Sequence, residues 1–401
     1  MRIFDSIHGY IDLDPIAVAI VNTHIFQRLR HISQTGVLSY VFPTATHTRF
    51  EHSIGTYHLA KRMISEISRK QPELCITEEM VMMISIAGLC HDLGHLLFSH
   101  LFDEFLEHTH CTHENAVHEI RSISLLRYAV ETYCIQLTND QLHVIGDLIY
   151  PKKSTYETWQ PQYQVGKWIF QIVSNPQNSI DVDKFDYLTR DTRAVGLKLG
   201  FDYSRLLMDA RVIGDEICYS SQCSEDIYQM FFLRYRLHRQ IYNHKAVKAI
   251  EILIVQLLHD LEKKMGISKY LDDPEKMIQL VDYLVFQQPH PNIRKIHTRD
   301  LPKLVYQDIS LGTERARHSG HCEQIEQMMK ERFDVSSYHI MRFTVGYVGG
   351  STNPLNNVHF YHGNSVVPGN FSLLINQDHR EYVFRIYCLD EKKDEILETL
   401  K

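Results

Sequence analysis

The chain has 401 residues, of which 44 % are hydrophobic and 23 % are charged, and its formal net charge is −7. This balance excludes a disordered chain and supplies enough apolar material for a large core. It also disfavours a basic nucleic-acid-binding protein, so a polyphosphate would have to be bound by a local group of Lys and Arg. Histidine is abundant, with 25 residues. Because imidazole is the commonest metal ligand in proteins, this excess directs attention to metal sites.

The cysteines and the N-terminus bear on the compartment. The eight cysteines include no CxxC pair, and a chain of this size needs no disulfides, so we expect reduced thiols. The N-terminal segment MRIFDSIHGYIDLDP has charges throughout, unlike a signal peptide. No stretch reaches the ~18 uncharged apolar residues of a membrane span. We therefore expect an intracellular protein, in the cytoplasm or nucleus, without a membrane partner.

Helical periodicity dominates most of the chain. Residues 1–15 are predicted to form a short extended or hairpin entry. Residues 16–34 have apolar side chains at helical spacing, and Gly36 follows as a stop. The other predicted helices are 52–68, 78–90, 114–133, 139–149, 162–174, 181–191, 203–210, 225–264 and 273–287.

The pattern changes near the C-terminus. From about residue 337, short β-branched and aromatic segments alternate with Gly, Asn and Pro, which predicts strands, and the tail EKKDEILETLK predicts a closing helix. The fold class is therefore mainly α. We expect a helical body over 1–290, a connecting or regulatory segment over 291–336, and a small α+β lobe over 337–401.

Four residues in three separate segments could form one metal site. They are His52 in HTRFEHS, His91 and Asp92 in CHDLGHLLFSH, and Asp183 in IDVDKFDY. Imidazoles and carboxylates bind first-row metals, and helices hold such ligands well. On a helix, His91 and Asp92 would point about 100° apart, and His95 would lie one turn after His91. A single His or Asp is more often a satisfied core residue, but the combination favours a metal site.

Basic residues accompany these segments. Arg49 precedes His52 by three positions, and Lys184 follows Asp183. A stripe on one predicted helix, at i, i+4, i+8 and i+11, consists of Arg234, His238, Tyr242 and Lys245. Guanidinium groups suit bidentate phosphate binding. The simpler alternative is a solvated basic helix face.

The order H…HD…D resembles the HD superfamily of metal phosphohydrolases. The longer strings DSIHGYIDL, YVFPTATHTRFEHSIG, IAGLCHDLGHLLFSHLFD and IDVDKFDYLTRD resemble the dNTP triphosphohydrolases that carry a sterile-alpha-motif domain before the HD domain. The resemblance covers nearly the whole chain, and we expect the HD body without the sterile-alpha-motif domain. It implies an enzyme that hydrolyses deoxynucleoside triphosphates to a deoxynucleoside and inorganic triphosphate.

The resemblance also implies roles for individual residues. The metal ligands would be His52, His91, Asp92 and Asp183, holding one or two divalent ions (Fe, Mn, Zn or Mg). The catalytic positions, one of whose histidines would act as the general acid, are His95, His100, Asp103, His113 and Glu114. The substrate-binding positions are Gln34, Arg49, Lys184, Tyr187, Asp191, Arg234, His238, Tyr242 and Asn243. Among them, Tyr187 would stack under the sugar and exclude ribonucleotides, and Asp191 would bind the 3′ hydroxyl.

Several positions depart from the family pattern. Thr35 and Asn243 replace a leucine and a glutamine at the base, which leaves the base preference open. Positions matching nucleotide contacts of allosterically activated members are Asn22, Arg30, Arg205, Arg299 and Lys303. Asn22 replaces an aspartate, and an amide cannot accept two hydrogen bonds from a guanine edge as a carboxylate does. We therefore expect a homo-oligomer, dimer or tetramer, with weakened or altered activation by a guanine nucleotide.

Three alternatives remain open from the sequence. Another HD reaction, on cyclic nucleotides or alarmones, is disfavoured by the basic residues and by Tyr187. A nucleic-acid-binding or nuclease role is disfavoured by the acidic balance. A non-catalytic oligomeric scaffold would have no need of the complete ligand set.

Overall fold

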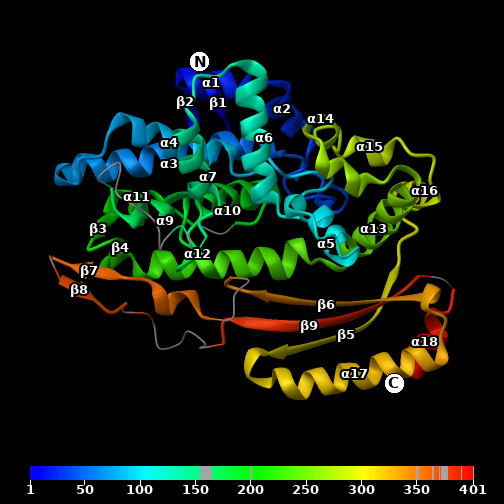
Figure 1. The fold of residues 1–401 in the computed structure, drawn as a ribbon. Coiled ribbons are helices and arrows are strands. Elements are labelled where there is room, and N and C mark those ends of the chain that lie inside the picture. Colours follow the sequence, from blue (N-terminus) through cyan, green and yellow to red (C-terminus); the bar gives the residue numbers. More distant parts are fainter. Residues whose placement is uncertain are drawn as a thin grey trace.

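The computed structural model describes residues 1–152, 155, 165–198, 201–348, 352–363, 365–369, 371, 378–389 and 391–400, without the side chains of 313 and 315–317. A helical body forms one layer, a three-stranded sheet lies along its base, and a long helix covers the outer face of that sheet (Figure 1). The fold is mainly α with small sheets, as the sequence predicts. No helix among the described residues is long and apolar enough to cross a membrane.

The N-terminus forms the predicted hairpin, but the helix predicted over 16–34 is divided. Thr23 interrupts it, because the Thr23 side chain accepts a hydrogen bond from Phe26 N at 3.1 Å and so starts a new helix. The elements are β1 (Arg2–Asp5), β2 (Gly9–Asp12), α1 (Pro15–Val21), α2 (His24–Gln27) and a 3-10 turn (Arg28–His31).

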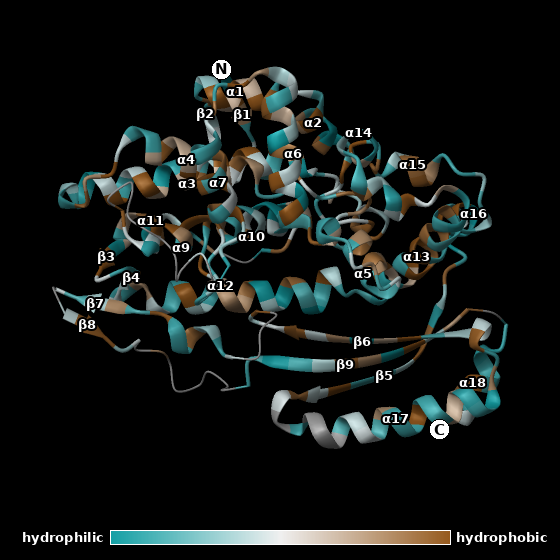
Figure 2. Cartoon of the chain, viewed as in Figure 1, coloured by the Kyte–Doolittle hydropathy of each residue, from teal (hydrophilic) through white to brown (hydrophobic). Residues whose placement is uncertain are grey.

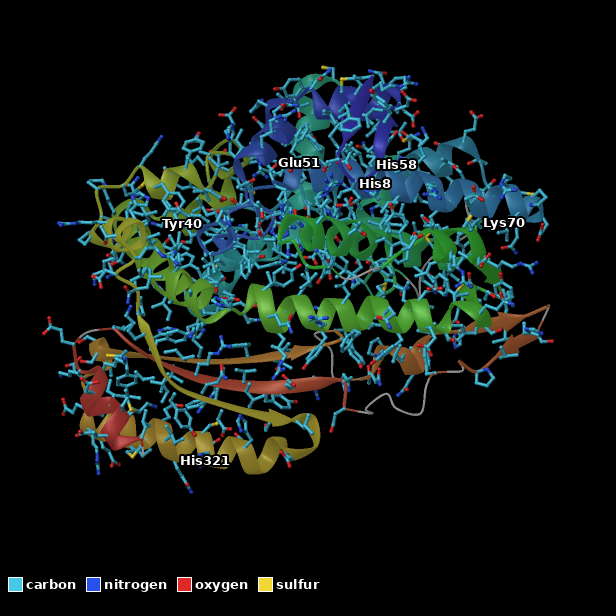
Figure 3. The ribbon with its side chains drawn as sticks, turned by 180° about the vertical axis from the view of Figure 1, so that it is seen from behind. His8, Tyr40, Glu51, His58, Lys70 and His321 are labelled. Atoms are coloured by element: carbon cyan, nitrogen blue, oxygen red, sulfur yellow. The ribbon has the colours of Figure 1, made fainter. Side chains whose placement is uncertain are left out.

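The centre of the body is α3 (Arg49–Lys70) packed against α4 (Glu78–Cys90). Thr48 and Glu51 form a capping box that fixes the start of α3, whose two ends are marked by Glu51 and Lys70 in Figure 3. The two helices approach closely at Gly88, where a Cβ would lie 3.0 Å from Thr56 O. The neighbouring helices are α6 (His118–Tyr133), α7 (Asn139–Ile149) and α10 (Val182–Ala194).

Shorter elements connect these helices. The predicted helix 162–174 is reduced to a 3-10 turn (Lys167–Ile169) and α9 (Phe170–Val173), and its first residues, 162–164, lie outside the described residues. The other connecting elements are α5 (His100–His108), a 3-10 turn (Glu114–Ala116) and α11 (Ser204–Asp209).

The prediction of a single helix over 225–264 was wrong. The structure has α12 (Ser224–Arg236), a π-helix (Leu237–Tyr242) and α13 (Lys245–Met265). His244 caps α13, since its Nδ1 accepts from Ala246 N at 3.3 Å. The helix predicted over 273–287 is likewise replaced by α14 (Pro274–Met277) and α15 (Tyr283–Phe286), which follow a 3-10 stretch (Ile267–Asp272).

The C-terminal sheet has the antiparallel order β5-β9-β6. Its elements are α16 (Pro291–Thr298), β5 (Lys303–Leu311), α17 (Arg315–Arg332), β6 (Tyr338–Gly346), β9 (Arg380–Cys388) and the predicted closing helix α18 (Lys393–Thr399). The segment expected to connect, 291–336, supplies one strand of this sheet. The reason is that β5 pairs along the length of β9 from Lys303 to Leu311, which charge and proline content did not indicate. The domain boundaries themselves remain a prediction.

A second sheet joins the lobe to the body. Its order is β3 (Arg211–Ile213), β4 (Glu216–Ser220), β7 (Phe360–His362) and β8 (Ser365–Val367), with β4 and β7 parallel.

Strand β9 is buried on both faces. Phe384, Ile386 and Cys388 pack with α17, while Tyr387 packs with Ala249 of α13. Figure 2 shows hydrophobic and hydrophilic residues mixed along nearly every helix, as expected where one face is buried. The sheet is therefore a middle layer that holds α13, and with it one wall of the site, in place.

Candidate active site

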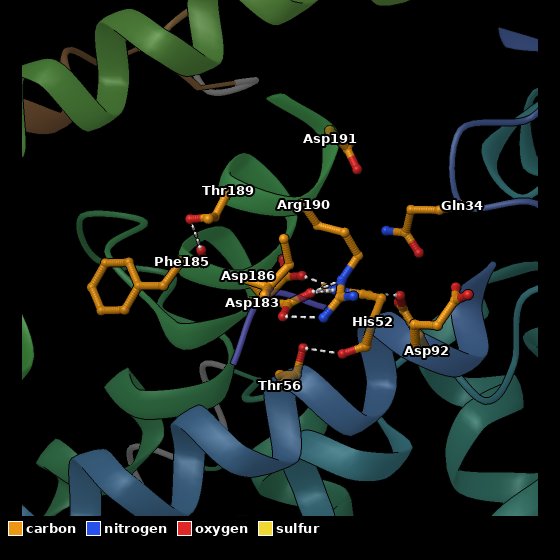
Figure 4. A network of polar contacts seen from close by, with 12 residues as sticks. Gln34, His52, Thr56, Asp92, Asp183, Phe185, Asp186, Thr189, Arg190 and Asp191 are labelled. Atoms are coloured by element: carbon orange, nitrogen blue, oxygen red, sulfur yellow. Dashed lines mark hydrogen bonds and ion pairs between the residues drawn. The ribbon is translucent and has the colours of Figure 1, made fainter. Parts of the chain in front are cut away.

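Four side chains from three segments of the chain converge on one point, and Figure 4 shows His52, Asp92 and Asp183 among them. His52 Nε2 lies 3.0 Å from Asp183 Oδ1 and 3.3 Å from Asp92 Oδ2. His91 Nε2 lies 3.4 Å from an oxygen of each of the same two carboxylates. Helices α3 and α10 supply His52 and Asp183, and the C-terminus of α4 supplies the other two. These are the four residues predicted as metal ligands.

The second ring nitrogen of each histidine determines what its Nε2 can do. His52 Nδ1 contacts Asp186 Oδ2 at 2.7 Å, and His91 Nδ1 contacts Gly88 O at 2.9 Å. Because a carboxylate and a carbonyl only accept, both Nδ1 atoms carry hydrogen, which leaves the Nε2 lone pairs facing the carboxylates. Both Nε2 atoms are buried without a hydrogen-bond partner among the described residues. Such a set of nitrogen and oxygen donors fits a divalent metal ion.

The electrostatics agree with this fit. Burial alone would raise the pKa of Asp183, but the neighbouring imidazoles of His52 and His91 hold it well below its usual range. Burial likewise opposes ionisation of Asp92, yet the Arg49 guanidinium lowers its pKa well below the ordinary value. Although burial lowers it, the neighbouring carboxylates of Asp183 and Asp186 raise the pKa of His52 well above its usual value, which favours a positive charge at its Nε2, whether a proton or a metal ion. The position between these groups thus favours a positive charge.

The turn after α4 differs from the prediction. His91, Asp92 and His95 were expected on one helix, but α4 ends at Cys90 and turns follow. The reason is a close approach of α6 at Gly94, where a Cβ would lie only 2.1 Å from His118 O and 2.4 Å from Ser122 N. Glycine at this position lets α6 lie against the turn.

A second cluster lies beside the metal-ligand group and is centred on Asp103. Asp103 Oδ2 lies 3.5 Å from both His100 Nδ1 and His118 Nδ1, and 3.9 Å from His95 Nδ1. The other oxygen of Asp103 is paired with Arg121, which is fully buried. His95 Nε2 in turn lies 3.2 Å from Asp92 Oδ1, so the two clusters are adjacent.

His113 and Glu114, predicted as catalytic, do not reach the cavity. His113 Nε2 contacts Asp272 Oδ1 at 2.9 Å, and its Nδ1 accepts from Asn115 N. His118 and Glu119 line the cavity instead, and the His118 ring stacks on that of His95 at 4.2 Å. The dipeptide His-Glu occurs twice in this stretch, and only the second copy begins α6.

The cavity in front of the metal-ligand group has a volume of about 540 Å³, which is in the range of small-molecule sites. Three cationic side chains that line it are among the residues predicted to contact phosphate. Arg49 pairs with Asp92 and donates from Nε to Ser99 Oγ at 2.9 Å, and Lys184 Nζ contacts Asp181 Oδ2 at 3.0 Å. Arg234 donates from Nη1 to Gly346 O at 2.9 Å, while its Nε has no partner among the described residues.

The far end of the cavity carries polar side chains of sugar-binding type. The Tyr242 hydroxyl donates to Asp191 Oδ2 at 2.5 Å, and His47 Nε2 contacts Asp191 Oδ1 at 2.6 Å. Gln34 Oε1 and Thr35 Oγ1 are buried without partners among the described residues. The wall is completed by the other predicted contacts Tyr187, His238 and Asn243. Lys245, expected in the basic stripe, is exposed at the start of α13 and does not line the cavity.

Sequence reasoning missed a buried ion pair in this wall. Lys248 Nζ lies 2.6 Å from Glu251 Oε2, and both residues line the cavity on α13. It also missed His47, whose only signal was its place in HTRFEHS, five residues before His52.

One rim of the cavity has unusual backbone geometry. Phe98 and Ser99 have φ values of 54° and 60°, a region that non-glycine residues rarely occupy. Asp282 holds the rim, because its carboxylate accepts from Phe98 N at 2.7 Å and from Ser33 N at 2.8 Å. Burial raises the pKa of Asp282 to about 6.

The five positions predicted for an activating nucleotide all lie away from this cavity. Asn22 is exposed at the end of α1, and Lys303 is exposed at the start of β5. Arg30 lies over the Phe50 ring at 3.5 Å, Arg205 pairs with Asp226 at 2.9 Å, and Arg299 donates to Tyr40 O at 2.7 Å.

Two histidines and two aspartates in this order define an HD-type centre, and residues 49–157 match the HD domain family. The chain is 33 % identical to the deoxynucleoside triphosphate triphosphohydrolase SAMHD1 homolog of Dictyostelium discoideum, over 98 % of this chain and 78 % of the relative. It is 30 % identical to the human deoxynucleoside triphosphate triphosphohydrolase SAMHD1, over 96 % of this chain and 70 % of the relative. A putative HD domain-containing protein of Acanthamoeba polyphaga mimivirus is 31 % identical, over 96 % of this chain and 92 % of the relative. The chain belongs to the SAMHD1-like family of HD-domain triphosphohydrolases.

Proposed function

We propose that this protein hydrolyses deoxynucleoside triphosphates to a deoxynucleoside and inorganic triphosphate in a metal-dependent reaction. The observation that carries the proposal is the pair of Nε2 atoms on His52 and His91, which have no hydrogen-bond partner among the described residues and face the carboxylates of Asp92 and Asp183 beside the cavity. The relatives named for this reaction match along nearly the whole chain, which supports the same substrate class.

His52, His91, Asp92 and Asp183 would hold the ion. When bound there, a divalent metal polarises a phosphoryl oxygen and activates water for attack at the α-phosphorus. The N and O donor set is compatible with Fe, Mn, Zn or Mg. Metal analysis of the purified protein distinguishes these, and one ion from two.

His118 is our candidate for the general acid. The attacking water loses a proton as its oxygen bonds to phosphorus, and the 5′ oxygen gains one as its bond to phosphorus breaks. Burial, together with His100, lowers the pKa of His118 to about 3, so its imidazole is neutral at rest. The anionic triphosphate would raise this pKa on binding, and the Asp103 carboxylate orients the ring for proton transfer.

The remaining walls would select the substrate. Arg49, Lys184 and Arg234 would bind the phosphates. Tyr187 would close the space beside the sugar, which favours deoxyribose over ribose. Asp191 is held by His47 and Tyr242 with its oxygens at the sugar end, where it would accept from the 3′ hydroxyl.

We also propose a homo-oligomer whose nucleotide activation is weakened or altered, since Asn22 cannot bind a guanine edge as a carboxylate does. The matched contacts Arg30, Arg205, Arg299 and Lys303 support a nucleotide activator outside the catalytic cavity.

Product analysis tests the function. Purified protein is incubated with each dNTP in Mg²⁺ or Mn²⁺, with and without GTP, and the products are separated by ion exchange. We expect deoxynucleoside plus intact triphosphate, and none from Asp183→Asn. Turnover confined to ribonucleotides, cyclic nucleotides or single phosphate groups would contradict the substrate assignment while leaving the metal site intact.

A further inference from the structure

A third group of metal-binding side chains lies in the C-terminal lobe, between β5 and α17. It consists of Asp308 on β5 and His318 and Cys322 on α17, and one donor atom of each lies within 4.8 Å of the other two. None of the three lines the catalytic cavity. His318 and Cys322 are four residues apart, so they share one face of the helix.

The separations match those that a tetrahedral zinc ion imposes. Cys322 Sγ lies 3.5 Å from His318 Nε2. Zn–S and Zn–N bonds of about 2.3 and 2.0 Å at a tetrahedral angle place sulfur and nitrogen ~3.5 Å apart. His318 Nδ1 lies 3.4 Å from Asp308 Oδ2, so the carboxylate lies close enough to the same ring to share one ion with His318 and Cys322.

The surroundings favour a site that is buried around Cys322 and open to solvent at Asp308. Cys322 is 3 % exposed, and the side chain of His318 is 10 % exposed. The Asp308 side chain is 32 % exposed and marks the side open to solvent. Three protein ligands would thus leave one coordination position for water.

The same three residue types could instead form a nucleophilic cysteine relay. The burial of Cys322 argues against it, because a substrate has no access to a sulfur in the core formed with Ile325 and Met329. Burial also raises the pKa of the Cys322 thiol, which keeps it protonated until a metal displaces the proton.

We propose that Asp308, His318 and Cys322 bind a zinc-type divalent cation that joins β5 to α17. The ion would add a bridge between two elements that also meet through side-chain packing and the Tyr306–His321 contact, so its binding would stabilise the lobe. The proposal is independent of the proposed catalytic function, because the HD centre offers only nitrogen and oxygen donors.

Cobalt spectroscopy tests this site in the full chain. Reduced wild-type protein is titrated with Co²⁺, and a thiolate-to-cobalt charge-transfer band is expected that Zn²⁺ then abolishes. Only a cysteine ligand produces this band, so metal at the HD centre does not contribute. Cys322→Ser should lose the band, and His318→Gln or Asp308→Asn should weaken Co²⁺ binding at least about tenfold.

Matched variants control for indirect effects. His321→Ala removes the neighbouring histidine of α17, which Figure 3 labels and which contacts the Tyr306 hydroxyl at 3.2 Å. Cys134→Ser removes an exposed cysteine. Both should keep the band, and Cys322→Ser should keep dNTP hydrolysis. The proposal is overturned by a wild type without the band or by a band that survives Cys322→Ser.

Discussion

Asp186 lies directly behind the candidate metal ligand His52. One carboxylate oxygen contacts His52 Nδ1 at 2.7 Å (Figure 4), and the other contacts His8 Nε2 at 2.6 Å. Arg190 donates two further hydrogen bonds of 2.9 Å to the same carboxylate. The side chains of all three partners are buried, so the direction of the His52 lone pair is fixed by a network that lies outside the cavity.

Replacing Asp186 with Asn should therefore weaken metal binding. An amide cannot accept from His52, His8 and Arg190 together, so we expect a loss of about 10- to 100-fold in metal affinity, measured by metal titration. Unfolding in urea should also show a loss of about 3 kcal/mol, because Arg190 loses a charged partner. Asp140→Asn, at an exposed position of α7, is the control. Unchanged metal affinity in a folded Asp186→Asn protein would refute the positioning role.

The two His-Glu pairs offer a matched test of the general acid. We expect His118→Gln to lower kcat by about 10²- to 10⁴-fold, since the 5′ oxygen would leave without its proton donor. His113→Gln should stay close to the wild type, because His113 contacts Asp272 outside the cavity. Steady-state kinetics on one dNTP with both variants decides between them. The reverse order of effects would show that His113 moves into the site with substrate.

Glycine at position 94 should be essential for stability. In Gly94→Ala the new Cβ would meet backbone atoms of α6 at 2.1 and 2.4 Å, and we expect a loss of about 1–3 kcal/mol or more. Gly320→Ala on α17 is the counterpart, because a Cβ there meets nothing within 4 Å. This second variant should gain about 0.5–1 kcal/mol from helix propensity. Urea unfolding of both proteins measures the difference, and equal effects would contradict the close approach of α6.

Asp282 predicts a pH dependence of stability. Its pKa is raised to about 6 by burial, so between pH 4 and pH 6 the folded state binds more protons than the unfolded state. The contribution of Asp282 is therefore fully present below about pH 4 and is lost as pH rises through about 6, by roughly 2–3 kcal/mol. The free energy of unfolding of the wild type relative to Asp282→Asn should fall over this window. A difference that stays constant from pH 4 to 7 would mean that Asp282 titrates normally.

The parts of the fold that the sequence predicted well are those with local determinants. Helices α4 and α7 have the predicted bounds because Thr77 and Thr138 accept the hydrogen bonds that start them. The interruption after Tyr242 has a weaker local signal, because the side chain that caps α13 is the imidazole of His244 and not one of the preferred capping residues. It also involves a residue far along the chain, since Arg385 Nη1 donates to the buried carbonyl of Asn243 at 2.6 Å.

In the candidate site too, local motifs predict some residues, while others depend on contacts between distant parts of the chain. The four metal-ligand candidates occur in motifs short enough to be read directly, and the structure brings them together. Choosing His118 over the equally plausible His113 required the position of α6 against the turn at Gly94. The contact of His47 with Asp191 spans 144 positions, and no local pattern predicts it.

Because of the π-helix from Leu237 to Tyr242, the number of residues between Arg234 and Tyr242 determines whether both side chains face the cavity. An α-helix turns about 800° over eight residues, which would leave Tyr242 about 80° away from Arg234. The wider π turns reduce the rotation per residue, and both side chains line the cavity. Removing one residue between them would therefore rotate Tyr242 away from the side of the helix that carries Arg234, even with every side chain that lines the cavity unchanged.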